Sequence, residues 1–544
     1  MSMLRGARGI VRQASTRCRV ARRWFTDDSK KHADNRDLIL SVLRSTATKR
    51  EARQYISRYT PRVTSGNVFE RDPADISIVP EDALRIALIK VRDIKSIEPD
   101  EIKGIGKTIS RLSRLGVSPI VVIDAGKERN DFLQLDNKPF RHYQKAITWK
   151  ANLLAHAIES ASDKMRARPI ESLLEVSPTA FSSANTELKM PVPEMILSPL
   201  TRGIVPVVVP LAFHPPSGEE MLVRADDVVY YLTNDLYSVH DDFAITVEKV
   251  IYIDPLGGIP SVERGGSGAS HVFVNLDQEL ADITAELHIP FVSPKTREIH
   301  LDNLRAMHKT LSILPLSATG LITTPRVAAL SSAKNPLIYN VLTDRPVVSP
   351  SLPVDTRKTP VLETTVVRKG MPVTTLKSQT GLDLVKESKL GRIDLTMIQE
   401  LIEDSFGRQI DMDHYLERIN SKVAGVIIAG GYQGAAIVTW EQTPDGRKVP
   451  YLDKFAVRRS SQGGSGVADI VFKSLVMQMF PNELLWRSRV TNPVNKWYFE
   501  RSKGTIKIPD SHWVMFWTGD STREQTELKD YLDICSDIPS SFKS

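Results

Sequence analysis

The residues best suited to chemistry lie between 449 and 499, where an apolar strand, a glycine-rich turn and a helix follow one another. The turn, at 458–466, reads RRSSQGGSG. Glycines let backbone N–H groups converge on an anion, and a helix N-terminus and arginine side chains add positive charge. The sequence therefore predicts a site for the pyrophosphate of a cofactor, with a flexible strand-to-helix link as the alternative.

A second group of residues predicts an anion site beside this turn. Arg487 and Arg489 are two positions apart in a strand expected at 484–489, so both project from one face. Strict alternation places Lys454 and Tyr451 on opposite faces of the preceding strand, but a β-bulge there would relax that assignment. Three cations together favour a small substrate with two carboxylates. A solvated edge face is the alternative.

The net charge gives little support to nucleic-acid binding. The formal charge is +7, but residues 1–24 contain seven arginines and no lysine, aspartate or glutamate, so removing them leaves 7 − 7 = 0. A neutral body lacks the electrostatic footprint of a nucleic-acid-binding protein. The arginine-rich, acid-free start is typical of a mitochondrial transit peptide and predicts the matrix as location. A disordered basic arm is the alternative.

Other function classes are excluded by what the sequence lacks. With two cysteines, Cys18 and Cys535, no disulfide framework or cysteine-based zinc site is expected. The 11 histidines form no HExxH pattern, so no metal is expected. No uncharged apolar run approaches the ~18 residues of a membrane span, so no membrane partner is expected.

Apolar runs and helical patterns alternate in the first half of the chain, which predicts an α/β domain at 80–344 with a mostly parallel sheet. Two glycine motifs there, at 104–108 and 265–268, are interpreted as turns. The first contains GKT, but Glu101 stands where a P-loop needs glycine. Apolar strand-like runs are expected at 83–91, 118–124, 204–211, 222–232, 250–253 and 271–276, and helices at 98–115 and 146–161.

The remaining segments are assigned by composition. Helical spacing predicts a helical segment at 33–65, and scattered prolines predict a linker at 345–385. A second α/β domain is expected at 386–540, with an amphipathic helix starting near Asp394, a hairpin at 423–440 and a last strand at 513–517.

The glycine turn resembles motif A of the GCN5-related N-acetyltransferases, because Gln462 and the four residues after it match that motif. Asn492, Tyr498 and Gly504 resemble the family's next motif. The resemblance implies an α+β acetyltransferase domain that binds acetyl-CoA. The implied cofactor-binding residues are Ala456, Val457, Arg458, Gln462, Gly463, Gly464, Ser465 and Gly466.

Longer stretches closely resemble the N-acetylglutamate synthases of mitochondrial type. They are YLDKF at 451–455, LWRSRVTNP at 485–493 and WYF at 497–499, with LDNL at 301–304 and SILP at 312–315 resembling the amino-acid-kinase-like domain of the fungal members. The resemblance implies transfer of acetyl from acetyl-CoA to L-glutamate, the first step of arginine biosynthesis. The implied glutamate-binding residues are Lys454, Arg487, Arg489 and Arg408, the last replacing a family lysine.

The resemblance also implies a mechanism. The glutamate amine attacks the thioester, N–H groups near Ala456 and Val457 hold the oxyanion, and Asn492 lies near the reaction centre. Tyr498 protonates the departing thiolate, with Tyr451 as the alternative.

The kinase-like domain departs from the active kinases it resembles. They carry Lys-x-Gly-Gly after the first strand, whereas Lys90 is followed by VRD. The resemblance implies a regulatory domain that binds L-arginine as an inhibitor and mediates homo-oligomerisation. A complex with acetylglutamate kinase is a further expectation.

Two other functions remain as alternatives. A general protein or polyamine acetyltransferase would take a cationic acceptor, which Arg487 and Arg489 disfavour. A non-catalytic subunit that binds acetyl-CoA or arginine and controls a kinase would not need Asn492 and Tyr498.

Overall fold

The computed structural model forms two compact units, called unit 1 and unit 2 here. It describes residues 84–124, 138–176, 187–239, 244–262, 269–290, 292–331, 335–352, 362–462, 466–519 and 525–543. The predicted transit peptide at 1–24 and helical segment at 33–65 lie outside these residues. Within the described part, no helix is long and apolar enough to cross a membrane.

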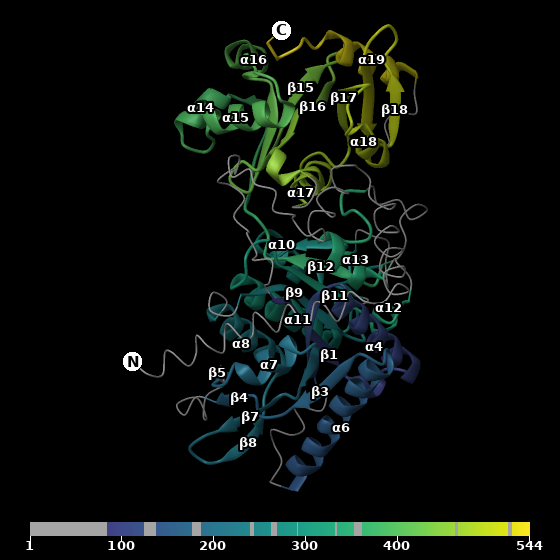
Figure 1. Ribbon diagram of the computed structural model, residues 1–544. Helices are drawn as coiled ribbons and strands as arrows, with labels where there is room; N and C mark the ends of the chain where they lie inside the picture. The colour runs from purple at the N-terminus through teal and green to yellow at the C-terminus, as the bar shows by residue number, and fades with distance from the viewer. Residues whose placement is uncertain are drawn as a thin grey trace, which may run out of the picture. The chain divides into compact units, whose positions relative to one another are not determined.

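Unit 1 is built on an eight-stranded sheet in the order β10-β12-β11-β9-β1-β2-β6-β3 (Figure 1). The pairs from β11 to β3 are parallel, whereas β12 runs antiparallel to β11. The strands are β1 (Leu84–Arg92), β2 (Val117–Asp124), β3 (Arg166–Ile170), β6 (Ile204–Val208), β9 (Ile245–Ile253), β10 (Phe273–Asn275), β11 (Thr319–Thr323) and β12 (Thr365–Arg368).

A four-stranded sheet and helices complete unit 1. The small sheet contains β4 (Leu174–Val176), β5 (Leu188–Lys189), β7 (Leu211–His214) and β8 (Glu219–Leu222). The helices are α4 (Pro99–Arg114), α6 (Lys138–Ser160), α7 (Glu194–Thr201), α8 (Ala225–Ser238), α10 (Leu276–Glu286), α11 (Pro294–Ser312), α12 (Pro325–Ala328) and α13 (Pro336–Thr343).

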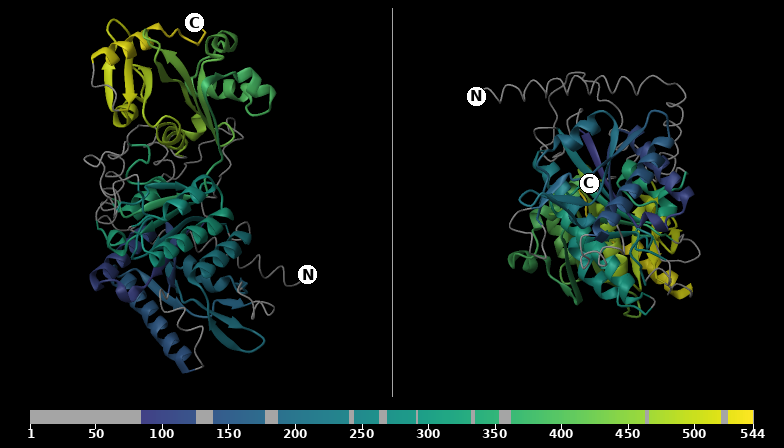
Figure 2. Two further views of the ribbon diagram at one scale, coloured as in Figure 1. Left: turned by 180° about the vertical axis from the view of Figure 1, so that it is seen from behind. Right: turned by 90° about the horizontal axis from the view of Figure 1, so that it is seen from below.

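The central strands of unit 1 are buried on both faces. In β1, the residues from Ile86 to Val91 are at most 1% exposed. Alternate side chains of β1, such as Ile86 and Leu88, pack in one hydrophobic cluster with α8 and α11. Helices α4 and α6 lie side by side outside the sheet (Figures 1 and 2). This explains why the strands appear in the sequence as continuous apolar runs, and it confirms the predicted α/β class.

Two expectations for the first half are wrong, and a third is not tested. Residues 222–232 fall mainly in helix α8, because an apolar run of this length does not distinguish a buried helix from a strand. Residues 104–108 form no turn. They lie inside α4, where an added Cβ at Gly104 or Gly106 would come within 2.5 Å and 2.3 Å of Ala329 Cβ and Ala157 O. The motif at 265–268 lies outside the described residues.

The linker expectation for 345–385 is wrong for two segments. Strand β12 pairs with β11 in unit 1, where Val366 and Val367 are buried. Strand β13 (Val373–Leu382) pairs with β14 at the edge of the second sheet. The prolines of this segment lie outside both strands. Proline content alone therefore revealed neither the apolar strand β12 nor the exposed edge strand β13.

Unit 2 is built on a seven-stranded sheet in the order β13-β14-β15-β16-β17-β19-β18. Its remaining strands are β14 (Val423–Ala429), β15 (Gly434–Gln442), β16 (Lys448–Val457), β17 (Leu484–Arg489), β18 (Gly504–Lys507) and β19 (Trp513–Thr518). Its helices are α14 (Leu384–Lys389), α15 (Leu395–Phe406), α16 (Met412–Ile419), α17 (Val467–Lys473), α18 (Asn495–Arg501) and α19 (Gln525–Asp537).

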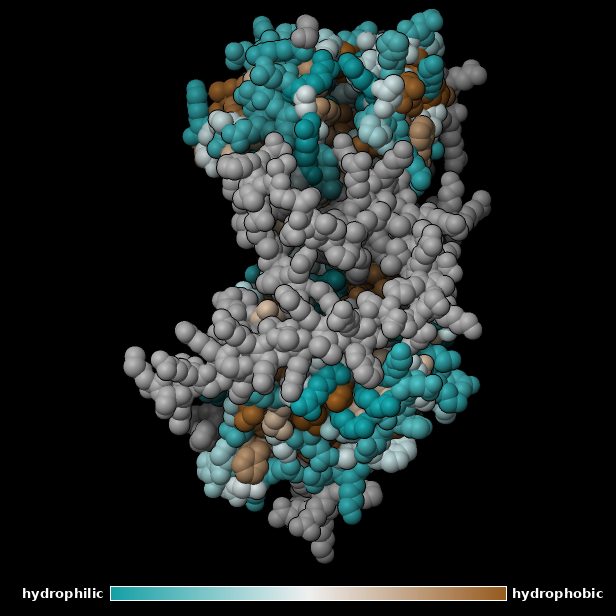
Figure 3. All heavy atoms as spheres, in the orientation of Figure 1, coloured by the Kyte–Doolittle hydropathy of each residue, from teal (hydrophilic) through white to brown (hydrophobic). Residues whose placement is uncertain are grey.

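Helices cover both faces of the second sheet. One face, called the donor face here, packs against α17 and α18. The other, the acceptor face, packs against α14–α16 over β14–β16 and against α19 over β17–β19. The described surface of this unit is mainly hydrophilic in the view of Figure 3, as expected for amphipathic helices that turn their apolar sides to a sheet.

Helix α15 shows how local sequence sets these elements. Asp394 caps its start by accepting hydrogen bonds from the N–H groups of Thr396 and Met397 at 2.8 and 3.2 Å. Gly407 ends it in the left-handed region at φ 66°. The predicted helix, the hairpin of β14 and β15 and the last strand β19 are confirmed.

Candidate active site

The candidate site is a notch between strands β16 and β17. The two strands run parallel, but they pair at a single register, Tyr451 with Leu485. Beyond this point the ladder ends, and the remaining edge of β16 does not pair with β17. A gap of this kind leaves backbone groups at mid-sheet that can bind a ligand.

A β-bulge at Asp453 decides which way Lys454 points. On β15, Val438 is paired with Leu452 and the adjacent Ile437 with Lys454, so Asp453 is the extra residue. Lys454 therefore lies on the acceptor face together with Tyr451, and its ammonium lies 4.5 Å from the centre of the Tyr415 ring. The bulge considered from the sequence is present, and it brings the third cation to the side of Arg487.

The predicted phosphate turn leads from β16 into α17 at the edge of the donor face. Gln462 Nε2 donates to Val457 O at 2.7 Å, and Gly466 takes a left-handed φ of 71° at the N-cap of α17. An added Cβ on Gly434 would come within 2.4 Å of Val467, so this glycine lets α17 pack closely on β15. Gly463, Gly464 and Ser465 lie outside the described residues.

The N–H groups of Ala456 and Val457, the two predicted oxyanion donors, point to opposite sides of β16. Arg458 N–H donates to Gln433 O at 2.8 Å, whereas Val457 N–H donates to Ser405 Oγ at 3.1 Å. Because alternate residues of an antiparallel ladder face the same neighbour, Ala456 faces β15 with Arg458. Val457 faces the open edge. Because its N–H group points to β15, Ala456 does not supply one of the predicted oxyanion contacts at the open edge.

The two candidate acids lie on opposite faces of the sheet. The ring of Tyr498, on α18, packs with Trp486 and Phe516 at centroid distances of 5.6 and 5.5 Å on the donor face. Tyr451 packs with Leu485 and the α19 cluster on the acceptor face. Burial raises the pKa of both phenols above the ordinary value, so both stay protonated at neutral pH.

The cations of the acceptor face differ in how they are held. Lys454 is 7% exposed and donates to Asp453 Oδ2 at 2.6 Å and to Ser541 Oγ at 3.2 Å. Arg487 donates to the carbonyl oxygens of Cys535 and Ile538. Arg489 is exposed, and its guanidinium lies 5.6 Å from the centre of the Trp513 ring.

Two further predicted residues are engaged locally. Asn492 Nδ2 donates to Ser488 Oγ at 2.8 Å, and its Oδ1 accepts the N–H of Val494 at 3.1 Å, which supports the turn into α18. Arg408 is exposed in the loop between α15 and α16, and it donates to Lys543 O at 3.3 Å. The structure brings Lys454 and Arg487 onto one face. Arg408 and Lys454 both contact the C-terminal residues, at Lys543 and Ser541 respectively.

Comparison with known proteins identifies the family. A family model described as the N-acetyltransferase of N-acetylglutamate synthase matches residues 383–538. The mitochondrial amino-acid acetyltransferase of Yarrowia lipolytica is 52% identical, covering 95% of this chain and 94% of the relative. This chain belongs to the mitochondrial amino-acid acetyltransferases.

A second relative by sequence agrees with this assignment. The mitochondrial amino-acid acetyltransferase of Debaryomyces hansenii is 34% identical and covers 97% of this chain and 100% of its own. These relatives and the family model show that the chain is an acyltransferase. Among solved structures, N-acetylglutamate synthase from Neisseria gonorrhoeae, complexed with coenzyme A and N-acetyl-glutamate, covers 86% of this chain and 97% of its own at 15% identity and a TM-score of 0.48.

Sequence reasoning missed a buried acid in this acetyltransferase. The side chain of Asp453 is 2% exposed and pairs with Lys454 and with Arg418 of α16. Burial alone would raise the pKa of Asp453, but Lys454 and Arg418 lower it to about 2. A carboxylate inside an apolar strand was the available signal, since buried acids need partners.

Replacing Asp453 with asparagine is expected to lower the free energy of unfolding by about 2 kcal/mol near pH 7. Because the folded pKa lies below the ordinary value of 3.8, this stabilisation is present above about pH 4 and is lost as the pH falls toward 2. Denaturant unfolding at pH 7, 5 and 3.5 measures it. Asp533→Asn, on the exposed side of α19, is the control. An equal loss in both variants would contradict the assignment.

A buried arginine links the two helices of the donor face. Arg501, at the end of α18, is 3% exposed and stacks on Trp497 at 3.9 Å from the ring centre. Its guanidinium donates to Asp469 of α17 at 3.2 Å and to Ser349 and Ser351 at 2.6 and 2.7 Å. Arg501 therefore fixes α18, which carries Tyr498, against the first turn of α17.

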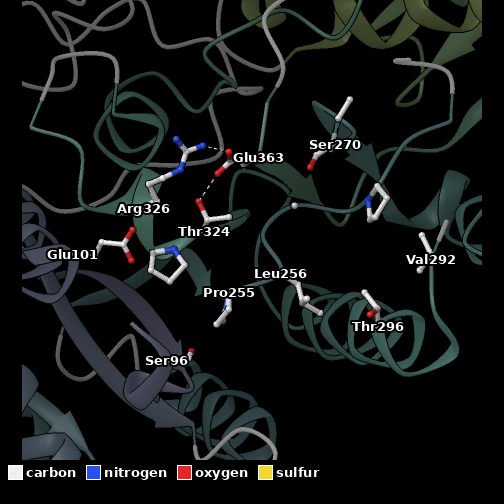
Figure 4. A pocket seen from close by; sticks show the side chains of 14 residues that line it. Ser96, Glu101, Pro255, Leu256, Ser270, Val292, Thr296, Thr324, Arg326 and Glu363 are labelled. Carbon is white, nitrogen blue, oxygen red and sulfur yellow. Dashed lines mark hydrogen bonds and ion pairs between the residues drawn. The ribbon is translucent and has the colours of Figure 1, made fainter. Parts of the chain in front are cut away.

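Unit 1 of the acetyltransferase has a separate pocket of about 590 Å³. It lies at the carboxyl ends of β9 and β11, where parallel α/β sheets bind ligands (Figure 4). Arg326 and Thr324 both donate to Glu363 there, the latter at 2.8 Å. This pocket belongs to unit 1 and is not part of the notch at β16 and β17.

Lys90 of unit 1 is held in a buried network. It is 1% exposed and donates to Asp226 Oδ1 at 2.5 Å and to Asn303 Oδ1 at 3.0 Å. The ammonium also lies 3.8 Å from the centre of the Tyr252 ring. A lysine so engaged stabilises the domain.

Proposed function

We propose that this acetyltransferase is an N-acetylglutamate synthase, which transfers the acetyl group of acetyl-CoA to the amino group of L-glutamate in the first step of arginine biosynthesis. The notch between β16 and β17 carries the proposal, because it joins a phosphate-binding turn to a set of cations on the acceptor face. An acyl donor and an anionic acceptor can therefore meet at one point of the sheet.

The cofactor lies along the donor side in this proposal. Arg458, Gln462 and the glycines up to Gly466 hold the pyrophosphate, and the α17 N-terminus adds its positive end. Val457 N–H, which meets Ser405 Oγ in the structure, is the group at the open edge. It is the backbone donor that we assign to the thioester oxygen.

Glutamate lies on the acceptor side. Lys454 and Arg489 bind its carboxylates, and Arg487 and Arg408 supply further positive charge. A cationic acceptor such as a polyamine or a lysine side chain would be repelled by this set. The geometry therefore favours an amino acid with two carboxylates over the general acetyltransferase alternative.

The reaction needs one bond to form and one to break. The neutral amine attacks the thioester carbon, a C–N bond forms, and the C–S bond breaks. Tyr498 gives its proton to the thiolate, because burial keeps the phenol protonated on the donor side. The proton lost by the amine leaves to water. Asn492 supports the turn that positions α18.

Unit 1 has a regulatory role in this proposal. It binds L-arginine as a feedback inhibitor and mediates homo-oligomerisation, and the protein forms a complex with acetylglutamate kinase. The N-terminal 24 residues direct the chain to the mitochondrial matrix. For comparison, N-acetylglutamate synthase from Neisseria gonorrhoeae has been solved in complex with coenzyme A and L-arginine.

Thiol release from acetyl-CoA tests the function. The purified full chain is expected to release CoA with glutamate at least about tenfold faster than with aspartate or lysine at equal concentration. Added arginine is expected to lower the glutamate-dependent rate. Acetyl-CoA binding without any glutamate-dependent release would contradict the enzyme assignment and favour the non-catalytic subunit.

A further inference from the structure

The last residues of the chain cross the acceptor face. After α19 ends at Asp537, residues 538–543, called the strap here, run to the loop between α15 and α16. Asp411 N–H donates to Ser541 O at 3.1 Å, and Lys543 N–H donates to Gln409 O at 3.0 Å. An isolated antiparallel bridge joins Phe542 to Ile410. These backbone bonds make the strap an ordered part of unit 2.

The path of the strap follows from how the acceptor face is covered. Helices α14–α16 bury one hydrophobic cluster over β14–β16, and α19 buries another over β17–β19. The seam between these clusters lies at β16 and β17, where the notch opens. Because the strap runs from α19 to the loop between α15 and α16, it bridges the two clusters across this seam.

The strap contacts cations from three separate elements. Lys454 Nζ, on β16, donates to Ser541 Oγ at 3.2 Å. Arg408, in the loop before α16, donates to Lys543 O at 3.3 Å. Arg487, on β17, donates to Ile538 O and to Cys535 O at the end of α19. Three of the four cations assigned to glutamate therefore meet the C-terminal residues.

Each contact has a different consequence. The carbonyl oxygens of Cys535 and Ile538 occupy N–H groups of Arg487 that a carboxylate would otherwise use. This arginine therefore positions the end of α19 and the start of the strap. Lys454 is different, because two of the three acceptors around its ammonium belong to the adjacent Asp453, at 2.6 and 3.4 Å, and the third is the Ser541 hydroxyl, which can itself donate a hydrogen bond. A carboxylate on Lys454 can accept a second hydrogen bond from that hydroxyl.

An aromatic pair closes the strap on its outer side. Phe542 lies 5.1 Å from Phe406 between ring centres, and the guanidinium of Arg408 lies 5.3 Å from the centre of the Phe542 ring. The Lys454 ammonium lies 5.8 Å from the same ring. The Phe542 ring therefore covers one side of the buried Lys454 ammonium, and burial strengthens the attraction of this cation for a carboxylate.

We propose that the strap forms a wall of the acceptor site and that Ser541 Oγ binds the acceptor carboxylate held by Lys454. The proposal rests on the proposed function and extends it. It assigns the discrimination between acceptors of different length to the C-terminal residues. Arg487 then acts as a positioning residue that holds this wall against the sheet.

Ser541→Ala tests the hydroxyl directly in the full chain. The glutamate KM is expected to rise about tenfold, while the acetyl-CoA KM stays within about twofold, because one hydrogen bond to a charged group is lost on the acceptor side. Ser541→Thr keeps the hydroxyl and is expected to restore most of the affinity. Ser536→Ala is the control, since Ser536 is exposed on α19 and donates to Leu532 O.

A chain that ends at Ile538 tests the wall as a whole. Its glutamate KM is expected to rise more than in Ser541→Ala, and its acetyl-CoA Kd, measured by tryptophan fluorescence, is expected to be retained. Phe542→Ala is expected to raise the rate with 2-aminoadipate relative to glutamate. An unchanged or lower glutamate KM in both Ser541→Ala and the shortened chain would overturn the proposal.

The unmodified chain separates this inference from the proposed function. If it releases CoA with glutamate and the strap variants behave like it, the strap has no part in acceptor binding and the function stands. If it releases no CoA with glutamate, the proposed function fails, and the wall proposal fails with it.

Discussion

Tyr498→Phe is expected to lower kcat with glutamate about a hundredfold, the low end for loss of a general acid. The ring packs among Trp486, Trp497 and Phe516, and phenylalanine keeps those contacts. Of the described residues, none accepts a hydrogen bond from the Tyr498 hydroxyl, so the fold does not need it. The KM values for acetyl-CoA and glutamate are therefore expected to stay within about threefold.

Tyr451→Phe is the matched control. Tyr451 is also buried, but it lies on the acceptor face with the α19 cluster. Its hydroxyl is distant from the donor side in this arrangement, so kcat is expected to stay within about fivefold of the unmodified enzyme. Steady-state CoA release from both variants decides between the two acids. A large loss in Tyr451→Phe alone would assign proton donation to the acceptor face.

Arg489→Ala is expected to raise the glutamate KM about tenfold to a hundredfold, because a hydrogen-bonded ion pair with a carboxylate is lost. Arg489 is exposed, and of the described residues none accepts a hydrogen bond from its guanidinium. The free energy of unfolding is therefore expected to change by less than about 0.5 kcal/mol. Glutamate titrations at saturating acetyl-CoA, combined with denaturant unfolding, measure both quantities.

Arg487→Ala gives the contrast on the same strand. Its guanidinium holds the carbonyls of Cys535 and Ile538, so its loss is expected to lower the free energy of unfolding by about 1 to 3 kcal/mol and also to raise the glutamate KM. Acetyl-CoA binding is expected to survive in both variants. If Arg489→Ala loses stability and Arg487→Ala does not, the division between binding and positioning is wrong.

Most elements of the fold could be predicted because their hydrophobic patterns are local. The runs that became β1 and β2 and the helix α4 were found within a residue or two. Helix α8 and strands β12 and β13 were missed. In each case packing against distant residues decides the structure: β12 exists because it pairs with β11, and β13 because it pairs with β14.

The candidate site divides in the same way. Residue types and spacing alone indicated the phosphate turn and the pair Arg487 and Arg489, whereas the family resemblance implied the acid Tyr498. The side on which Lys454 lies depends on the bulge at Asp453, which strict alternation does not predict. The end of β16–β17 pairing after Tyr451 also has no signal in either strand.

By itself, the sequence determined the α/β class, the position of the glycine turn and the family resemblance, because these depend on residue order within short segments. Only the tertiary structure showed that Arg487 holds the end of α19, that Asp453 neutralises part of the cation set, and that residues 538–543 cross the acceptor face. The contacts of Arg487 and of residues 538–543 join residues 48 to 135 positions apart. Spacing along a chain carries no information about such pairs, because folding brings them together through the packing of both helical layers on one sheet.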